Sequence, residues 1–200
     1  MPFRNLLLIA ALVLAGCTAA TSPSSRVDET RVRMLLTSLA HDSMQGRRAG
    51  TESAAQAARF IAQHMEEIGL TPAGDSAFHQ RVFAARVQVN GRRRMMVVPD
   101  EAALDTVPES DRIYDANVVG VIRGSDPALR DEAIVVGAHF DHIGIIEPVD
   151  GDSIANGADD DASGVVAVLE IARALRHGPA PKRTVIFVAF AGEEGGGIGS

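Results

Sequence analysis

Three short groups of polar side chains could carry chemistry in this sequence. "AHFDH" contains His139 and Asp141, "NGADDDASG" contains three consecutive aspartates (159–161), and "AGEE" contains Glu193 and Glu194. Imidazole and carboxylate groups both bind zinc, and carboxylates also act as general acids and bases. Adjacent carboxylates repel one another, so three of them before an apolar helix are best explained if they neutralise bound cations. Asp141, two residues after His139, can accept a hydrogen bond from the ring nitrogen that does not bind metal.

The elements around these groups predict that they meet in space. "AIVVGAH" and "TVIFVAFAG" are valine- and isoleucine-rich runs typical of buried strands, as is "NVVGVI" earlier in the chain. An amphipathic helix is predicted between the first two runs, over residues 163–176. Strand, helix, strand predicts two parallel strands with a right-handed crossover. Because sites in open α/β sheets form beyond the carboxyl ends of the strands, the three polar groups are expected at one sheet edge.

The preceding part of the chain predicts helices and a hairpin. Residues 27–40 and 52–70 carry apolar stripes with helical spacing, and Thr51 or Ser53 can cap the second helix. "MQGRRAGTES" between them is predicted to be a loop. Asn90-Gly91 between two extended runs indicates a hairpin. We interpret "GRRRMM" as the exposed end of that hairpin in preference to a phosphate site.

Composition limits the classes of function. The 200 residues are enough for one domain with a real core, and the hydrophobic content of 46% with 22% charged residues fits a globular protein. The formal net charge of −7 argues against nucleic acid as the main partner, since such partners need a basic face.

The N-terminus has the pattern of a secretion signal. Residues 1–16 combine Arg4 with a short apolar stretch, and "LAGC" places the only cysteine, Cys17, where bacterial lipoproteins carry their lipid. We therefore predict a lipoprotein signal peptide over residues 1–16 and a flexible tether over residues 17–26. The expected location is the bacterial cell envelope, either lipid-anchored at the outer membrane facing the periplasm or secreted. The only expected membrane contact is the lipid anchor.

The three motifs also resemble a known family. In this order, "VVGAHFDHIG", "NGADDDASGVVAVLEIARAL" and "RTVIFVAFAGEE" resemble the co-catalytic, two-zinc metallo-aminopeptidases, which include bacterial leucyl aminopeptidases, glutamate carboxypeptidases and glutaminyl cyclases. The resemblance covers residues 116–200 strongly and residues 30–82 more loosely. It implies an α/β, three-layer zinc-exopeptidase-like fold with a mostly parallel central sheet flanked by helices. Residues 27–200 would be the N-terminal part of that domain, with helices and a hairpin over 27–110 and the βαβ metal-site core over 111–200.

The resemblance implies a role for individual residues. His139 binds one zinc ion, Asp160 bridges two zinc ions, and Glu194 binds the other. Glu193 is the general base that takes a proton from the metal-bound water, and Asp141 is the partner that orients His139.

The remaining polar residues of the motifs have no ligand role by this resemblance. Asp159 and Asp161 are not ligands, and Asp161 suits the positive end of the helix dipole. His142 is expected only to lie close to the site.

The implied function is zinc-dependent removal of an N-terminal residue from peptides or proteins with a free N-terminus. Two rival functions of the same fold are glutaminyl cyclotransfer and carboxypeptidase activity. A rival from another class is a non-catalytic lipoprotein whose site has degenerated. In the family an aspartate and a histidine that follow later in the chain complete the ligand set, and neither is present here. We therefore expect a truncated chain that is inactive, or nearly so, by itself.

Overall fold

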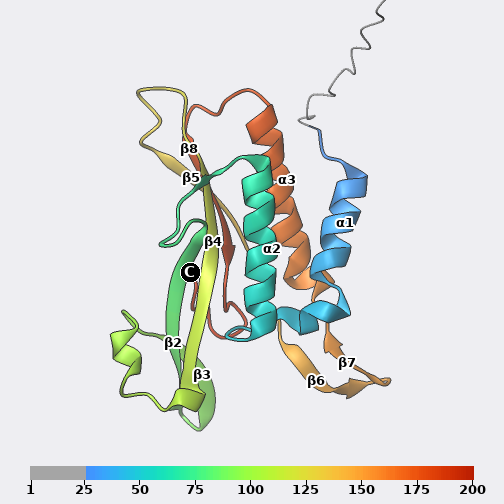
Figure 1. Cartoon of the computed structure of the whole chain (residues 1–200), viewed down its shortest axis with the longest axis vertical. Helices are drawn as coiled ribbons and strands as arrows, with labels where there is room; N and C mark the ends of the chain where they lie inside the picture. Colours follow the sequence, from blue (N-terminus) through green and yellow to red (C-terminus); the bar gives the residue numbers. More distant parts are fainter. Residues whose placement is uncertain (1–25) are drawn as a thin grey trace, which may run out of the picture.

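The computed structural model describes residues 26–200 of the chain (Figure 1). The predicted signal peptide, Cys17 and all but the last residue of the predicted tether lie outside the described residues. Figure 1 shows a central sheet with helices packed against it, which confirms the predicted α/β class. Within residues 26–200, no helix combines the length and the apolar character needed to cross a membrane.

One six-stranded sheet organises the described structure. Its strands follow the order β3–β2–β4–β8–β5, and β1 pairs with β4 outside that path. β5 and β8 are parallel, whereas the other strand pairs of this sheet are antiparallel. The strands are β1 (Thr71–Pro72), β2 (His79–Val89), β3 (Arg92–Val97), β4 (Arg112–Ile122), β5 (Ala133–His139) and β8 (Thr184–Phe190).

The prediction of a mostly parallel sheet is wrong for the described residues. β4, which contains the run "NVVGVI", lies antiparallel to β8, and the β2–β3 hairpin extends the sheet from β4 in antiparallel pairs. Residues 117–120 of β4 are buried. A continuous apolar run indicates a strand that is buried on both faces but does not indicate its direction. The sequence pattern therefore could not distinguish a parallel from an antiparallel strand.

The predicted strand–helix–strand unit is confirmed. β5 continues through a small hairpin, β6 (Gly144–Val149) and β7 (Asp152–Ala155), and a π-helical turn, η4 (Ala158–Ala162). α3 (Ser163–His177) follows and leads back to β8. In the parallel ladder His139 pairs with Phe190, so the carboxyl ends of both strands lie at the same edge.

The α helices cover one face of the sheet. Figure 1 shows α1 (Glu29–Leu39), α2 (Glu52–Ile68) and α3 on the same side of the strands. The second helical layer of a three-layer fold is therefore not found within residues 26–200. The predicted cap Thr51 accepts a hydrogen bond from the amide of Ala54, and Gly69 ends α2 with a φ of +83°.

Three short 3-10 helices complete the described elements. The stretch predicted as a loop between α1 and α2 contains η1 (Asp42–Arg47). The polar connection between β3 and β4 contains η2 (Ala102–Leu104) and η3 (Glu109–Asp111). The predicted hairpin is confirmed, because Asn90 and Gly91 have positive φ values of 51° and 76° between β2 and β3.

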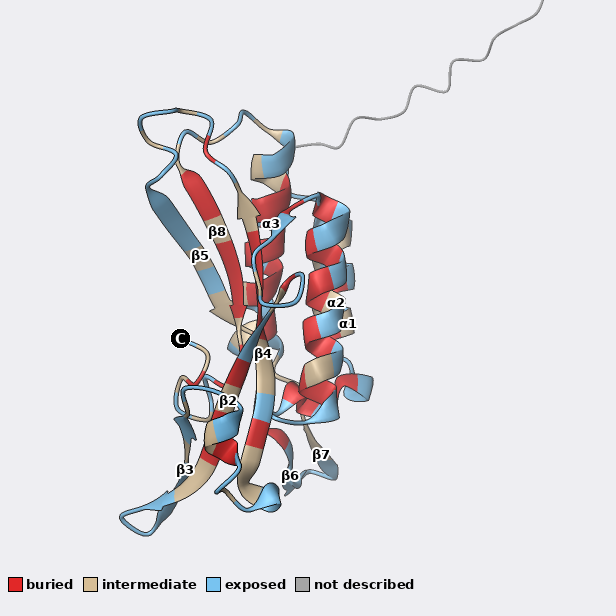
Figure 2. Cartoon of the chain, turned by 60° about the vertical axis from the view of Figure 1, so that its left-hand side comes forward, coloured by how far each residue is buried: buried red, intermediate tan, exposed pale blue. Residues whose placement is uncertain are grey.

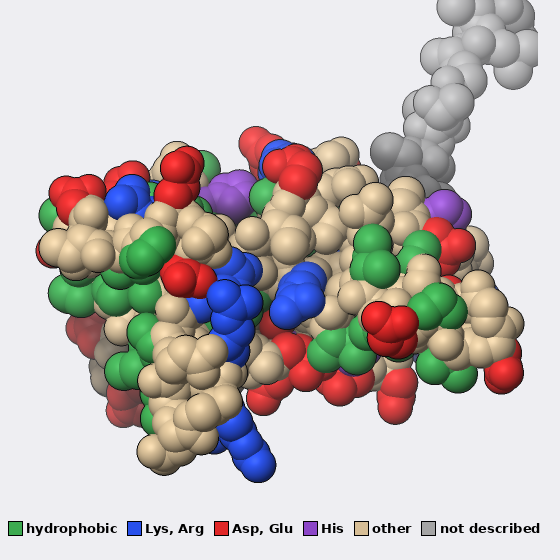
Figure 3. Space-filling view, turned by 90° about the horizontal axis from the view of Figure 1, so that it is seen from below, with side chains coloured by type: hydrophobic (Ala, Val, Ile, Leu, Met, Phe, Trp, Pro, Cys, Tyr) green, Lys and Arg blue, Asp and Glu red, His purple; other side chains and the backbone are tan. Residues whose placement is uncertain are grey.

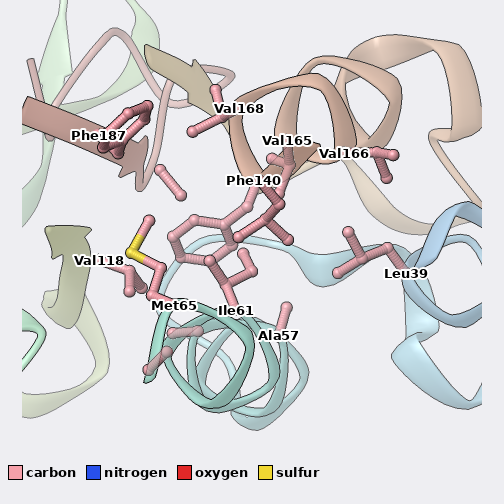
Figure 4. Close-up of a cluster of buried hydrophobic side chains, with 14 of the residues drawn as sticks. Leu39, Ala57, Ile61, Met65, Val118, Phe140, Val165, Val166, Val168 and Phe187 are labelled. Carbon is pink, nitrogen blue, oxygen red and sulfur yellow. The ribbon is translucent and has the colours of Figure 1, made fainter. Parts of the chain in front are cut away.

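The main core lies between the helices and the sheet. Figure 4 shows Phe140 at its centre, with Ile61 and Met65 of α2 on one side and Val165 of α3 on the other. Phe187 of β8 faces the same cluster, and all five side chains are fully buried. Figure 2 shows the contrast between β8, which is mostly buried, and β5, which is largely exposed. The core residue Phe140 thus directly follows His139, the first candidate ligand.

We predict that Ile61→Ala lowers the free energy of unfolding by about 2–5 kcal/mol, because it leaves a cavity between α2 and the strands. Glu66→Ala, on the exposed side of the same helix, should change it by no more than about 0.5 kcal/mol. Urea unfolding followed by circular dichroism measures both. Equal effects of the two substitutions would contradict the packing of α2 against the sheet.

Candidate metal centre

The three polar motifs meet where β5 and β8 end, as the strand pattern predicts. His139 is the last residue of β5, Glu193 follows the end of β8, and Asp160 lies in η4 before α3. One ring nitrogen of His139, Nε2, lies 3.1 Å from Asp160 Oδ1 and 3.9 Å from Glu193 Oε2. The His139 side chain is 15% exposed, whereas Asp160 is 64% exposed. A half-buried ring therefore faces two carboxylates that are open to solvent.

Asp141 is fully buried and holds the turn after β8. Its carboxylate oxygens accept hydrogen bonds from the backbone amides of Glu193, at 2.9 Å, and Glu194, at 3.3 Å. Burial raises the pKa of the Asp141 carboxyl, while the two amide donors and nearby His139 act in the opposite direction. The two consecutive acidic residues are thereby positioned by a carboxylate that lies just past the end of the neighbouring parallel strand, β5.

The contact between His139 and Asp141 differs from the one expected. His139 Nδ1 lies 3.1 Å from the backbone oxygen of Asp141 and 3.6 Å from its carboxylate. The carboxylate is already engaged by the two amides beyond β8, so the carbonyl is the closer partner of the ring. With Nδ1–H donating to that carbonyl, the lone pair of Nε2 faces Asp160.

His142 joins the site through Glu194. His142 Nδ1 lies 2.6 Å from Glu194 Oε1, and the ring is 15% exposed. One ligand atom each from His142, Asp160 and Glu194 lie within 4.8 Å of one another. The sequence reasoning gave His142 no role, although its place three residues after His139 was the available signal.

The three consecutive aspartates have different surroundings. Asp161 Oδ1 accepts a hydrogen bond of 2.8 Å from the amide of Gly164 in the first turn of α3, as expected for the positive end of a helix. A Cβ at Gly164 would lie within 3 Å of that carboxylate, so only glycine leaves room for it. The Asp159 side chain has no hydrogen bond or ion pair within residues 26–200. The peptide bond between Asp160 and Asp161 is cis.

A buried arginine that the sequence reasoning missed joins the segments around the site. Arg47 is fully buried, and its guanidinium donates to the carbonyls of Phe140 at 2.6 Å and Leu39 at 2.5 Å. It also donates to the carbonyls of Asn156 and Gly157, each at 2.7 Å. Burial lowers the pKa of Arg47, and the charges of two nearby aspartates (141 and 161) oppose that shift.

Arg47 therefore fixes two of the three site segments relative to each other. Its donors reach the residue after His139 and the two residues that enter the turn carrying Asp160. The signal in the sequence was "GRRAG", in a stretch where the family resemblance is loose. A charged residue in a predicted loop is ordinarily exposed, so its burial could not be anticipated.

The donor set fits a divalent cation. In tetrahedral zinc sites with bonds of 2.0–2.1 Å, neighbouring ligand atoms lie roughly 3.3 Å apart. The 3.1 Å between His139 Nε2 and Asp160 Oδ1 is close to that spacing. Both atoms are electron-pair donors when the imidazole is neutral, so a cation between them removes their repulsion. Asp160 also lies near Glu194 and can be shared between two such positions.

Comparison with known proteins identifies the segment that carries these residues. The sequence model of Peptidase family M28 matches residues 117–200, the segment that holds all three polar motifs. This segment matches peptidase family M28. The match covers 84 of the 200 residues, so it describes this segment and not the whole chain.

Two fungal proteins are among the curated relatives of this chain. A "Probable zinc metalloprotease" of Pyrenophora teres f. teres is 43% identical over 83 residues, which cover 42% of this chain and 17% of that protein. "Leucine aminopeptidase 1" of Fusarium vanettenii is 32% identical over 138 residues, covering 62% of this chain and 34% of the relative. The chain thus spans about a third or less of the length of these relatives.

Solved structures share the fold of this chain. The Legionella pneumophila LapA aminopeptidase superposes with a TM-score of 0.51 at 21% identity, over 85% of this chain and 36% of that one. An aminopeptidase from Aneurinibacillus sp. strain AM-1 gives a TM-score of 0.56 at 16% identity, over 89% of this chain and 66% of that one. These likenesses establish the α/β architecture described above.

We predict that Arg47→Met lowers the free energy of unfolding by at least about 3 kcal/mol, because four backbone carbonyls lose their donor inside the protein. Arg48→Met removes the same kind of side chain from an exposed neighbouring position and should change stability by about 0.5 kcal/mol or less. Urea unfolding of the two variants tests this difference. An Arg47→Met variant as stable as its control would show that the hydrogen bonds of Arg47 contribute little to the free energy of unfolding.

Proposed function

We propose that this protein is a two-zinc exopeptidase that removes the N-terminal residue of peptide substrates. The observation that carries the proposal is the approach of His139 Nε2 to Asp160 Oδ1, at 3.1 Å, with Glu193 beside them. In this proposal His139 and Asp160 would hold one ion, and Asp160 and Glu194 would hold the other. His142, in contact with Glu194, orients that carboxylate or adds a further ligand.

Glu193 is the proposed general base. Its carboxylate is 58% exposed and lies beside the His139–Asp160 pair, while its backbone amide is held by buried Asp141. Zinc ions at such a site supply Lewis acidity, which lowers the pKa of a coordinated water and polarises the scissile carbonyl. Glu193 accepts the proton of the attacking water and transfers it to the leaving amine. Asp141 acts by position alone, because its carboxylate is occupied by two backbone amides.

Peptide hydrolysis is favoured over cyclotransfer and over a non-catalytic role. The named curated relatives are a probable zinc metalloprotease and a leucine aminopeptidase, which supports a hydrolase acting on peptide bonds. The acidic rim formed by Asp160, Glu193 and Glu194 suits a substrate with a positively charged N-terminus. A degenerate site would not need to keep the donors at metal-ligand spacing.

The residues present supply an incomplete ligand set. Each ion would receive two protein ligands, counting shared Asp160, where the family resemblance implies three, unless His142 contributes. We therefore expect micromolar or weaker zinc binding and slow turnover from these 200 residues alone. The lipid anchor at Cys17 and the cell-envelope location are also part of the proposal, and rest on the sequence of residues 1–17.

The proposed test compares three conservative substitutions in the motifs. Asp160→Asn should weaken zinc binding at least ten-fold, because the shared carboxylate is lost. Asp159→Asn, its matched control on the same turn, should leave zinc binding unchanged. Glu193→Gln should keep zinc binding and lower hydrolysis of leucyl-anilide by about 100-fold or more. Isothermal titration calorimetry with zinc and single-turnover assays at excess protein provide the two readouts.

Two results would contradict the proposal. If Asp160→Asn and Asp159→Asn bound zinc with the same affinity, the metal site would not lie at this edge of the sheet. If zinc-dependent hydrolysis persisted in Glu193→Gln, Glu193 would not be the general base, and only the proposed metal site would remain.

A further inference from the structure

A hollow lined by arginines lies directly beside the candidate metal centre. Its volume is about 390 Å³, and it is bounded by the end of the β2–β3 hairpin, by Arg48 and by the turn after β8. Figure 3 looks onto this end of the molecule and shows basic side chains gathered on it among acidic ones. The lining residues are Arg48, Arg86, Arg92, Arg93, Arg94, Met95, Glu194, Gly195 and Gly196.

The hairpin is packed against the turn that carries Glu194. A Cβ at Gly195 would lie 2.5 Å from Met95 Sδ, so the methionine occupies the space above this glycine. Met95 also packs on a small apolar cluster that joins the sheet to the end of the chain, formed by Val82, Ala84, Ile113 and Ile198. The arginines of β3 are therefore held at a fixed place beside a candidate metal ligand.

The charge of the hollow is unbalanced. Five arginines and one carboxylate, that of Glu194, line the hollow. Glu194 is engaged by His142, and the Arg86 guanidinium donates to the carbonyl of Ser110. Arg93 pairs with Asp111 at 3.5 Å. The side chains of Arg48, Arg92 and Arg94 form no ion pair or hydrogen bond with any residue in the range 26–200. Such a concentration of positive charge is unexpected in a chain whose net charge is −7.

A second, smaller hollow connects this one to the metal centre. It has a volume of about 180 Å³, and its lining includes Asp141, His142 and isoleucines 143, 145 and 146. Arg48, Met95, Glu194 and Gly195 line both hollows, so the two are adjacent. An extended peptide that passes Glu194 can therefore reach the metal centre and the arginines at once.

We propose that the arginine-lined hollow binds carboxylates of the substrate, so that the site prefers peptides with acidic side chains close to the cleaved bond. Guanidinium groups bind carboxylates through two parallel hydrogen bonds, and this geometry fits the side chains of Asp and Glu. The choice of a peptide follows from the adjoining metal centre, and the inference rests on the proposed function in that respect. Nucleic acid is disfavoured by the overall negative charge.

The experiment measures binding of two fluorescein-labelled peptides, Leu-Glu-Glu-Glu and Leu-Gln-Gln-Gln, to the 200-residue chain by fluorescence anisotropy. The acidic peptide should bind at least ten-fold more tightly. In the triple variant Arg48→Gln, Arg92→Gln, Arg94→Gln this preference should fall at least five-fold. The matched control changes three exposed arginines elsewhere, Arg33→Gln, Arg59→Gln and Arg123→Gln, and alters the net charge by the same amount. The control should keep the preference.

Three outcomes would overturn the inference: equal binding of the two peptides, an equal loss in the control variant, or stronger binding of a single-stranded oligonucleotide of the same charge. The measurement needs no turnover and is made with and without zinc. A preference for the acidic peptide without zinc binding would therefore contradict only the proposed function. Zinc binding without the preference would contradict only the proposed binding of carboxylates in the hollow.

Discussion

Two fully buried charged side chains hold the backbone at the sheet edge where β5 and β8 end. Asp141 accepts the amides of Glu193 and Glu194, and Arg47 donates to the carbonyl of Phe140 and to the turn before Asp160. A buried charge is tolerated only where dipoles of opposite sign surround it, and here the backbone supplies them. The hydrogen bonds that stabilise these two buried charges therefore also position the segments that carry the candidate ligands.

The candidate ligands lie on this rigid base and face solvent. Asp160 and Glu193 are more than half exposed, whereas the groups that orient their backbone are buried. This division leaves the candidate ligands open to solvent while buried hydrogen bonds hold the segments that carry them. It also explains why Phe140, at the centre of the apolar core, matters to the site, since its carbonyl receives Arg47 and its neighbour is His139.

The sequence predicted that the three polar motifs meet at one sheet edge, and it predicted the surrounding architecture less well. The motifs of His139, Asp160 and Glu194 could be brought together because each lies next to an apolar run, and such runs predict where a strand or helix begins or ends. The antiparallel direction of β4 was not recoverable, because a strand buried on both faces has the same composition in either direction. Arg47 was missed because its burial depends largely on carbonyls that are distant in the sequence, those of Phe140, Asn156 and Gly157. The spacing of residues within a short stretch of sequence cannot predict such long-range contacts.

The central claim is that the ends of β5 and β8 and the start of the α3 crossover form one zinc site around Asp160. The most direct measurement is a crystal structure of the zinc-loaded protein with anomalous data collected on both sides of the zinc absorption edge. The account predicts an anomalous peak about 2.0–2.1 Å from both His139 Nε2 and an Asp160 oxygen, and a second peak between Asp160 and Glu194. Peaks elsewhere on the protein, or no peak within bonding distance of His139 and Asp160, would contradict it.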